Sequence, residues 1–401
     1  MNSHNSKQSG FAHLLILVLI IVITIGGVGF FVKNRSSKSV KTSPDSNRVI
    51  STGWDKGCTG NQRIAMTHMP MNITDVSNVA PMGLTAGAHV TPIDHLYFYQ
   101  NPGPRDKYPV YAMADGTIIE IQVRNVNVDS GSNRPAEYRI VIQHSCQTIS
   151  YFDLVTKLDD SILSKAPNAA TKGFSGRINV KSGQTIGWIG GQSLDTGIYN
   201  LGMTLKGFTH PSMYIAEAWK VHTDDFFSYF SEPLKSQMLA KNPRSDEPRS
   251  GKIDYDQPGK LIGNWFKQGT NGYSGSGTKV GNGDGTGYWS THLAIFYAAY
   301  NAKEIIVSVG SFINNQPDAY SVVGNAPDPA TVTSDSGVVK YEIMKAEQGG
   351  SKNFEAQNTR PIDGVILLQV LSGEKLKVEK FPGKTGAQVT GFTAAAETYE
   401  R

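Results

Sequence analysis

The chain has 401 residues, enough for two ordinary domains, and carries a formal net charge of only +4 at pH 7. Its lysines and arginines are spread along the sequence rather than clustered, which argues against a nucleic-acid-binding surface. Charged residues make up 18% of the chain and glycine is abundant. This composition favours β-rich domains with many turns over helical ones.

An apolar run without a formal charge occupies residues 11–32, after a tail of residues 1–10. At 1.5 Å per residue, a helix of this length crosses a bilayer core of about 30 Å. The run is longer than the roughly 7–15 apolar residues of a secretory signal, so we expect a single transmembrane helix that is retained. A polar linker rich in serine and lysine follows over residues 33–50.

The orientation of this span is less evident. Four basic residues follow the span closely, and by themselves they would keep the bulk of the chain in the cytoplasm. The short N-terminal tail and the low charge of the rest favour export. We therefore expect a single-pass protein of the cell membrane with an extracytoplasmic body. An alternative is a structural component of a surface appendage, which would require cleavage between Gly10 and Phe11.

Residues 51–250 are expected to form a first, mainly antiparallel β domain. A loop with two prolines and mixed charges, residues 241–249, marks its end. Within it, a short helix or turn is expected over residues 158–163, and helical character over residues 224–240. The predicted strands are 95–99, 117–123, 138–143 and 148–152.

Two motifs in this domain each have the pattern of a strand, a tight turn led by glycine and a second strand. They are residues 109–119 (PVYAMADGTII) and residues 178–190 (INVKSGQTIGWIG). We interpret both as β-hairpins. Together with their surroundings, residues 83–190 resemble the lysostaphin-type (LytM, M23) peptidase domain. The resemblance implies a β-sheet domain similar to a barrel-sandwich hybrid, which in active members holds a catalytic zinc ion.

The resemblance also shows which zinc-site positions have changed. The family's His-x-x-x-Asp motif matches His95, and its aspartate falls on Tyr99. The strand Tyr-x-His-Leu matches residues 151–154, so that Asp153 replaces the catalytic histidine. The motif His-Leu-His matches residues 200–202, which provide asparagine and glycine instead. A hydrolytic zinc ion needs three protein ligands and an open position for water. The resemblance therefore implies a degenerate module without a cofactor, more a binding part than an enzyme.

Degenerate modules of this family serve in the cell envelope, so the expected partners are the membrane and either peptidoglycan or an envelope protein. The expected binding groove on the sheet is lined by His95, Tyr97, Tyr99, His144 and Asp153. Aromatic faces that flank a few polar groups suit glycan or peptide recognition.

A rival hypothesis is an active zinc metallopeptidase with rearranged ligands. His89, Asp94 and His95 lie within seven residues and would supply them. Pro92 prevents a helix between them, so they could converge only on a turn that leads into a strand. The plainer interpretation is that Asp94 and His95 stabilise this turn through hydrogen bonds to the backbone.

The remaining region, residues 251–401, is expected to form a second β domain, either a barrel or a sandwich. Its predicted strands are 261–266, 290–297, 305–309, 365–370 and 376–381. A glycine-rich loop is expected between residues 268 and 287. The two cysteines, Cys58 and Cys146, would form one disulfide in an exported protein and remain thiols in the cytoplasm.

Overall fold

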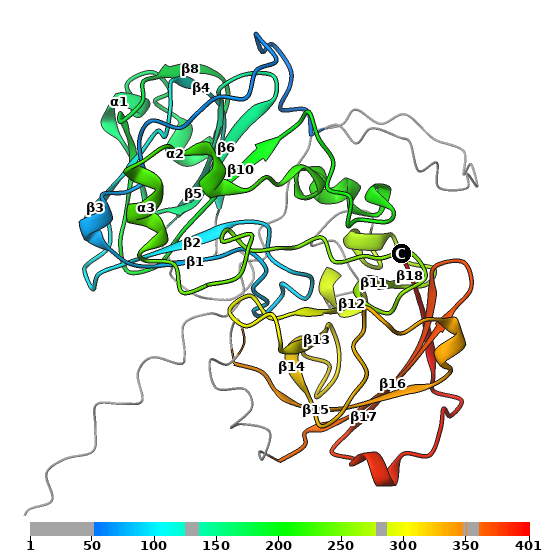
Figure 1. Cartoon of the computed structure of the whole chain (residues 1–401). Coiled ribbons are helices and arrows are strands. Elements are labelled where there is room, and N and C mark those ends of the chain that lie inside the picture. Colours follow the sequence, from blue (N-terminus) through cyan, green and yellow to red (C-terminus); the bar gives the residue numbers. More distant parts are fainter. Residues whose placement is uncertain (1–51, 125–135, 278–286, 348–349, 351–360) are drawn as a thin grey trace, which may run out of the picture.

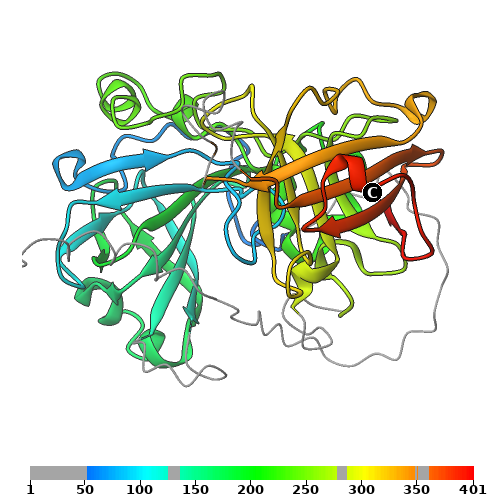
Figure 2. The ribbon, with the colours of Figure 1, turned by 90° about the horizontal axis from the view of Figure 1, so that it is seen from below.

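The structure, a computed structural model, describes residues 52–124, 136–277, 287–347, 350 and 361–401. The predicted transmembrane helix and the polar linker lie outside these residues, as does part of the glycine-rich loop. Among the described residues, no helix has the length and apolar character needed to cross a membrane. The chain forms two β bodies that lie side by side (Figures 1 and 2). The prediction of a mainly β protein with antiparallel sheets is confirmed.

The first body is built on a seven-stranded sheet of order β1-β2-β10-β6-β5-β4-β8, in which all neighbouring strands are antiparallel. In chain order the strands are β1 (Val76–Ala80), β2 (Leu96–Gln100), β4 (Gly116–Arg124), β5 (Glu137–Gln143), β6 (Thr148–Val155), β8 (Phe174–Val180) and β10 (Leu194–Asn200).

A second, three-stranded sheet has the order β3-β9-β7 and comprises β3 (Tyr108–Tyr111), β7 (Lys157–Leu158) and β9 (Thr185–Ile189). The two motifs predicted as hairpins are both corners between sheets. In the first motif β3 pairs with β9, whereas β4 pairs with β5 and β8. In the second, β8 belongs to the large sheet and β9 to the small one. A local pattern shows the turn but not the partner of each strand, which explains why the hairpin interpretation was wrong.

Short helices complete the first body. They are η1 (Ile73–Asp75), α1 (Asp160–Leu163), α2 (Ala169–Lys172), η2 (Pro211–His222), η3 (Phe226–Tyr229) and α3 (Leu234–Leu239). The turn or helix predicted over 158–163 corresponds to β7 and α1. The helical character predicted over 224–240 is limited to η3 and α3, because the chain is interrupted by extended backbone at Phe230 before a proline at 233.

The central strands β5, β6 and β10 bury both faces of the large sheet, with alternate residues of each strand on opposite sides. One face carries Ile140 and Phe152, which share a single core with the small sheet and the short helices. The other face carries Val141 and Tyr151, which form a smaller cluster with Trp54. Because this second face is also covered, it is not an open groove of the kind expected from the sequence.

The second body is a closed eight-stranded antiparallel barrel, so that of the two predicted alternatives the barrel is correct. Its strands are β11 (Gly263–Lys267), β12 (His292–Tyr297), β13 (Ile305–Val309), β14 (Asp318–Val323), β15 (Val339–Lys345), β16 (Gly364–Leu371), β17 (Lys375–Pro382) and β18 (Glu397–Glu400). Four short helices connect or follow them: η4 (Gly272–Ser274), η5 (Tyr288–Thr291), η6 (Ser334–Ser336) and η7 (Gly386–Gln388). Strand β18 pairs with both β17 and β11 and closes the barrel.

Arg401, next to β18, fixes this closure from inside the protein. Its guanidinium donates hydrogen bonds to Glu374 and to three backbone carbonyls of residues 257–262, and it lies 4.0 Å from the ring centroid of Trp265. The carbonyl oxygen of Arg401 also lies 2.5 Å from Nδ1 of His210, just before η2. The barrel end is thereby tied to the first body.

The interface between the two bodies is partly apolar. Phe266, Tyr273, Tyr288 and Trp289, all from the barrel region, belong to the core cluster of the first body. Polar contacts add to it, since the Asn264 side-chain amide donates to the Tyr214 hydroxyl of η2 over 2.9 Å. The barrel therefore helps to hold η2 in place over the large sheet.

Candidate functional site

Three adjacent strands bring most of the predicted site residues together. In the register of β2, β10 and β6, Asp195 lies directly opposite both Tyr97 and Asp153. Directly paired residues share one face of a sheet, and residues two apart on a strand also share it. The same face therefore carries Tyr99 and, just before β2, His95. Four of the five predicted groove residues are brought together here.

A cluster of charged side chains surrounds this row, and we call it the charge cluster. It consists of Asp94, His95, Arg124, Arg139, Asp153, Asp195 and Lys220.

At the centre of the cluster, His95 lies between two carboxylates. Its Nδ1 is 3.3 Å from Oδ1 of Asp94, and its Nε2 is 3.3 Å from Oδ2 of Asp195. Burial alone would lower the pKa of His95, but the two carboxylates outweigh it and raise this pKa to about 9. At neutral pH His95 is therefore an imidazolium with a proton on each ring nitrogen. In this state neither nitrogen offers a lone pair, so a metal ion would have to displace a proton to bind there.

Lys220 supplies a second buried cation. Its side chain is 1% exposed, and its ammonium donates to the Pro92 carbonyl over 2.7 Å and lies 3.8 Å from Oδ1 of Asp94. Burial would raise the pKa of Asp94, but the charges of Lys220 and His95 hold it well below its usual range. The carboxylate also accepts a hydrogen bond from the Tyr199 hydroxyl. The turn before β2 is thus built around a fixed negative charge and two cations.

The Asp153 carboxylate accepts hydrogen bonds from three side chains. It accepts from Nε and Nη2 of Arg139 over 3.0 and 2.7 Å, from Arg124, and from the Tyr151 hydroxyl over 2.9 Å. Although burial acts in the opposite direction, the two arginines lower the pKa of Asp153 to about 2. A carboxylate held in this state is a poor general base near neutral pH.

Side chains from elsewhere in the chain cover the charge cluster. Trp219 of η2 stacks on Trp54 with ring centroids 5.3 Å apart and lies over the guanidinium of Arg139. The Tyr273 ring of the barrel region lies 5.6 Å from the Lys220 ammonium. As a result His95, Asp153 and Asp195 are only 6%, 3% and 7% exposed. Tyr97 and Tyr99 remain half-buried.

The rearranged ligand set fits a metal ion poorly. The ring centroids of His89 and His95 are 6.2 Å apart, and burial together with the charge of His95 lowers the pKa of His89 to about 3. His89 is therefore neutral, but its neighbours His95 and Lys220 are both cations and repel a third positive charge. Among the described residues, no group of three or more His, Cys, Asp or Glu side chains is arranged to hold a metal ion.

The fifth predicted residue, His144, lies elsewhere. It follows β5, and its ring nitrogens lie 2.8 Å from the Asp115 carbonyl and 2.8 Å from the Ser150 hydroxyl. Ser150 precedes Tyr151 on β6 and so faces the opposite side of the sheet. His144 instead lines a separate cavity of about 330 Å³, where the start of β4 meets the ends of β5 and β8. The structure therefore does not place it in one groove with His95.

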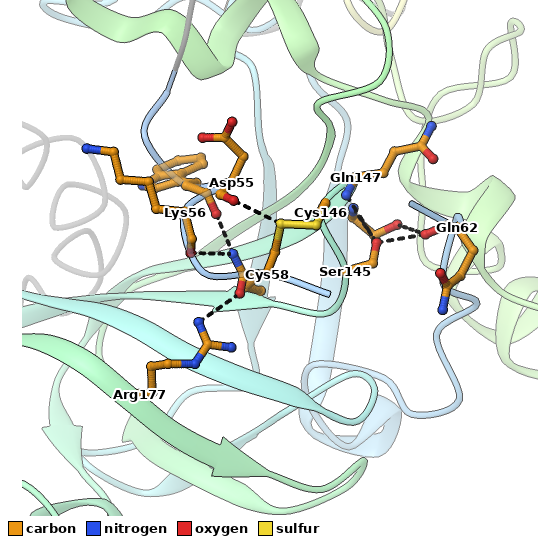
Figure 3. The surroundings of a disulfide bond; sticks show 11 residues. Asp55, Lys56, Cys58, Gln62, Ser145, Cys146, Gln147 and Arg177 are labelled. Atoms are coloured by element: carbon orange, nitrogen blue, oxygen red, sulfur yellow. Dashed lines mark hydrogen bonds between the residues drawn. A yellow bond between two sulfur atoms is a disulfide. The ribbon is translucent and has the colours of Figure 1, made fainter. Parts of the chain in front are cut away.

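Beside this cavity, Cys58 and Cys146 form a disulfide with their Cα atoms 5.0 Å apart (Figure 3). The bond attaches the segment before β1 to the turn between β5 and β6. Hydrogen bonds reinforce the attachment, because the Cys146 amide donates to the Gly60 carbonyl and the Ser145 hydroxyl donates to the Gln62 carbonyl.

Sequence reasoning missed the charged partners of the site. Asp195 lies on β10, five residues before Asn200. Asn200 is the residue that matches the first histidine of the family's His-Leu-His motif. Asn200 lies at the far end of β10, where its side-chain amide donates to Asp224. Lys220 comes from η2, which the sequence did not predict. Nothing in the local pattern marks Arg124 or Arg139 as partners of Asp153, because their meeting depends on the strand order.

Comparison with known proteins gives weak likenesses. No protein-family model matches the chain, and no curated protein matches its sequence. Among solved structures, a zinc-containing peptidase from Vibrio cholerae matches with 20% identity and a TM-score of 0.22, covering 33% of this chain and 36% of its own. Lysostaphin matches with 12% identity and a TM-score of 0.24, covering 83% of this chain and 90% of its own. The chain thus spans about a third of the first protein, and likenesses with TM-scores this low assign it to no family.

Proposed function

We propose that the chain is a membrane-anchored extracytoplasmic protein whose first body is a non-hydrolytic, peptidase-like module that binds cell-envelope material. The partner would be peptidoglycan or an envelope protein. The observation that carries the non-hydrolytic part is the charge cluster, in particular the imidazolium of His95 between Asp94 and Asp195. The peptidase likeness rests on the residue motifs described above.

The charge cluster lacks what hydrolysis requires. A zinc hydrolase needs neutral or anionic donors around one point and an open position for the attacking water. Here the central histidine is protonated, the Asp153 carboxylate is bound by two arginines, and η2 covers the site. The buried ammonium of Lys220 supplies the positive charge that balances Asp94. The cluster therefore supports a structural role in holding η2 on the sheet.

The disulfide supports export. Stable disulfides form in oxidising compartments and are rare in the cytoplasm. The bond between Cys58 and Cys146 joins residues 88 positions apart, so it constrains a large part of the first body. Together with the apolar run at 11–32, it favours an extracytoplasmic body attached to the cell membrane.

The test of non-hydrolytic binding uses the full-length protein in detergent. We expect no stoichiometric zinc by elemental analysis, no digestion of purified sacculi, and co-sedimentation of the protein with sacculi or cross-linking to an envelope protein. Stoichiometric zinc that is lost in a His89→Ala variant, together with digestion, would instead establish an enzyme. Absence of both sacculus binding and an envelope cross-link would refute the binding function.

The membrane side is tested separately. Protease added to intact cells should cleave the body of the chain, and the Cys58–Cys146 bond should be oxidised in protein isolated under conditions that trap free thiols. Protection of the body from protease, with both cysteines trapped as thiols, would place it in the cytoplasm.

A further inference from the structure

The cavity beside the disulfide has the features of a small-molecule site. Its volume of about 330 Å³ falls at the lower end of the range typical of such sites. It forms where the start of β4, the end of β5 and the end of β8 meet the segment that carries Cys58. Gly116 lets the end of β5 pack closely against β4 beside this cavity, because a Cβ atom there would lie 2.8 Å from Nδ1 of His144 and 2.7 Å from Ile142.

Most polar groups on the floor of the cavity already have partners. The buried Gln143 amide donates to the Trp54 carbonyl over 2.6 Å, and the buried Ser145 hydroxyl donates to Gln62. His144 has both nitrogens engaged, and burial lowers its pKa to about 4, so it adds no charge at neutral pH. The polar groups of the floor are therefore uncharged and already hydrogen-bonded.

The charged groups at the rim leave an excess of positive charge. The Asp115 carboxylate accepts hydrogen bonds from the Lys181 ammonium and from the Ser182 amide. The Arg177 guanidinium donates from one nitrogen, Nη1, to the neutral Oε1 of Gln143 over 3.2 Å. Among the residues that the structure describes, no carboxylate forms an ion pair with Arg177. Its cation is therefore available to a ligand.

Unused hydrogen-bond capacity in the cavity is mainly of the donor type. Arg177 has further N–H groups, and Figure 3 shows its side chain reaching from β8 toward the segment that carries Cys58. The Asn179 side chain uses its oxygen to accept from Thr117, and its NH₂ group has no partner within the described part of the chain. A ligand with a negative charge and acceptor oxygens would satisfy both groups.

The geometry points to this cavity as a binding site for a small carboxylate, such as the terminal carboxylate of a short peptide, held by Arg177 with Asn179 beside it. A guanidinium binds a carboxylate through two parallel hydrogen bonds, and one such anion would neutralise the single excess charge of the rim. This site is distinct from the charge cluster, and the inference does not depend on an envelope partner.

The disulfide is part of the wall of this site. Thr59, which lines the cavity, follows Cys58 directly, and the bond to Cys146 keeps this segment against the turn that carries His144 and Ser145. Opening the bond should loosen one wall while leaving Arg177 in place. Affinity for the carboxylate should therefore fall on reduction, but less than on loss of the guanidinium.

The test is saturation-transfer NMR on the full-length protein in detergent, with N-acetyl-Ala-Ala as the probe and its C-terminal amide as the matched ligand control. We expect the acid to bind and the amide to bind at least about tenfold more weakly, since a hydrogen-bonded ion pair is lost. Arg177→Gln should weaken binding of the acid roughly 10- to 100-fold. Arg177→Lys should fall between the two, and Lys157→Gln, an exposed charge on β7, should bind as the parent does.

Each result bears on the inference. Both Arg177 and Lys157 are exposed, so neither variant should impair folding, and circular dichroism checks this. Equal signals for acid and amide, no signal for either, or unchanged binding in Arg177→Gln would overturn the site. If inorganic phosphate does not displace N-acetyl-Ala-Ala, the site is selective for a carboxylate. Phosphate that binds while the acid does not would overturn the carboxylate assignment.

Discussion

Replacing Lys220 by methionine is the sharpest test of how the charge cluster works. The substitution keeps a long apolar side chain in nearly the same volume and removes only the ammonium. That ammonium is buried, donates to the Pro92 carbonyl and lies 3.8 Å from Asp94. In the variant, the Asp94 carboxylate loses a cation and the Pro92 carbonyl loses its donor.

The expected loss of stability follows from these two changes. Removing one partner of a buried ion pair typically costs about 3–5 kcal/mol, because the remaining charge is left in a medium of low dielectric. The unsatisfied carbonyl adds to this, while the apolar methionine offsets part of it. We therefore expect the Lys220→Met variant to lose about 3–5 kcal/mol of unfolding free energy.

Urea denaturation of the full-length protein, followed by tryptophan fluorescence, measures this change. Trp219 is adjacent to Lys220 and stacks on Trp54, so the signal reports on the covered face. Lys157→Met, at an exposed position, is the matched control and should change stability by less than about 0.5 kcal/mol. The double variant with Asp94→Asn should recover part of the loss. A loss below about 1 kcal/mol, or strictly additive effects in the double variant, would refute the role assigned to the ammonium.

Further predictions concern the pH dependence of stability, the contacts of Arg401 and the disulfide. The pKa of His95 is about 9 in the folded protein and about 6.5 in the unfolded chain, so its contribution to the unfolding free energy should be complete below pH 6.5. About 3 kcal/mol of it should be lost as pH rises to 9, and His95→Gln should reduce this slope in denaturation curves measured across the pH range. The pKa of about 3 for half-buried His89 acts in the opposite direction, so the unfolding free energy should fall as pH drops from 6.5 toward 3, and a shallower fall over this range in His89→Gln checks it. Arg401→Ala should lower the unfolding free energy of the barrel by about 3–5 kcal/mol, seen by circular dichroism as a urea transition at lower concentration. An unchanged midpoint would contradict the role given to the Arg401 guanidinium in barrel closure. Cys58→Ser should cost roughly 4 kcal/mol from the open 88-residue loop, measured against the oxidised parent in urea, and equal midpoints with and without reductant would argue against it.

The sequence predicts the mainly β character well, because strands such as 138–143 and 305–309 have a strong local pattern of β-branched and apolar residues. It fails where the partner of a strand decides the structure. Residues 109–119 contain the expected strand, turn and strand, but the two strands enter different sheets. No signal within eleven residues can distinguish a hairpin from such a corner, since hydrogen-bond partners come from β8 and β9 far along the chain.

The candidate site shows the same division. His95, Tyr97, Tyr99 and Asp153 could be brought together from strand motifs, because alternation fixes the face on which each side chain lies. The protonation states of these side chains and the covering of the face could not be predicted from such motifs. The protonation of His95 depends on Asp195 and the covering of the face depends on η2, both of which come from later segments of the chain.

The closure of the barrel by β18 has a consequence for synthesis of the protein. Strand β11 must wait for a partner that the ribosome makes about 130 residues later, and until then β11 and β17 each present an unpaired edge. A nascent chain that has completed the first body but not β18 exposes two hydrogen-bonding edges to its neighbours. Premature truncation before Glu397 should therefore yield aggregates in place of a shorter folded protein.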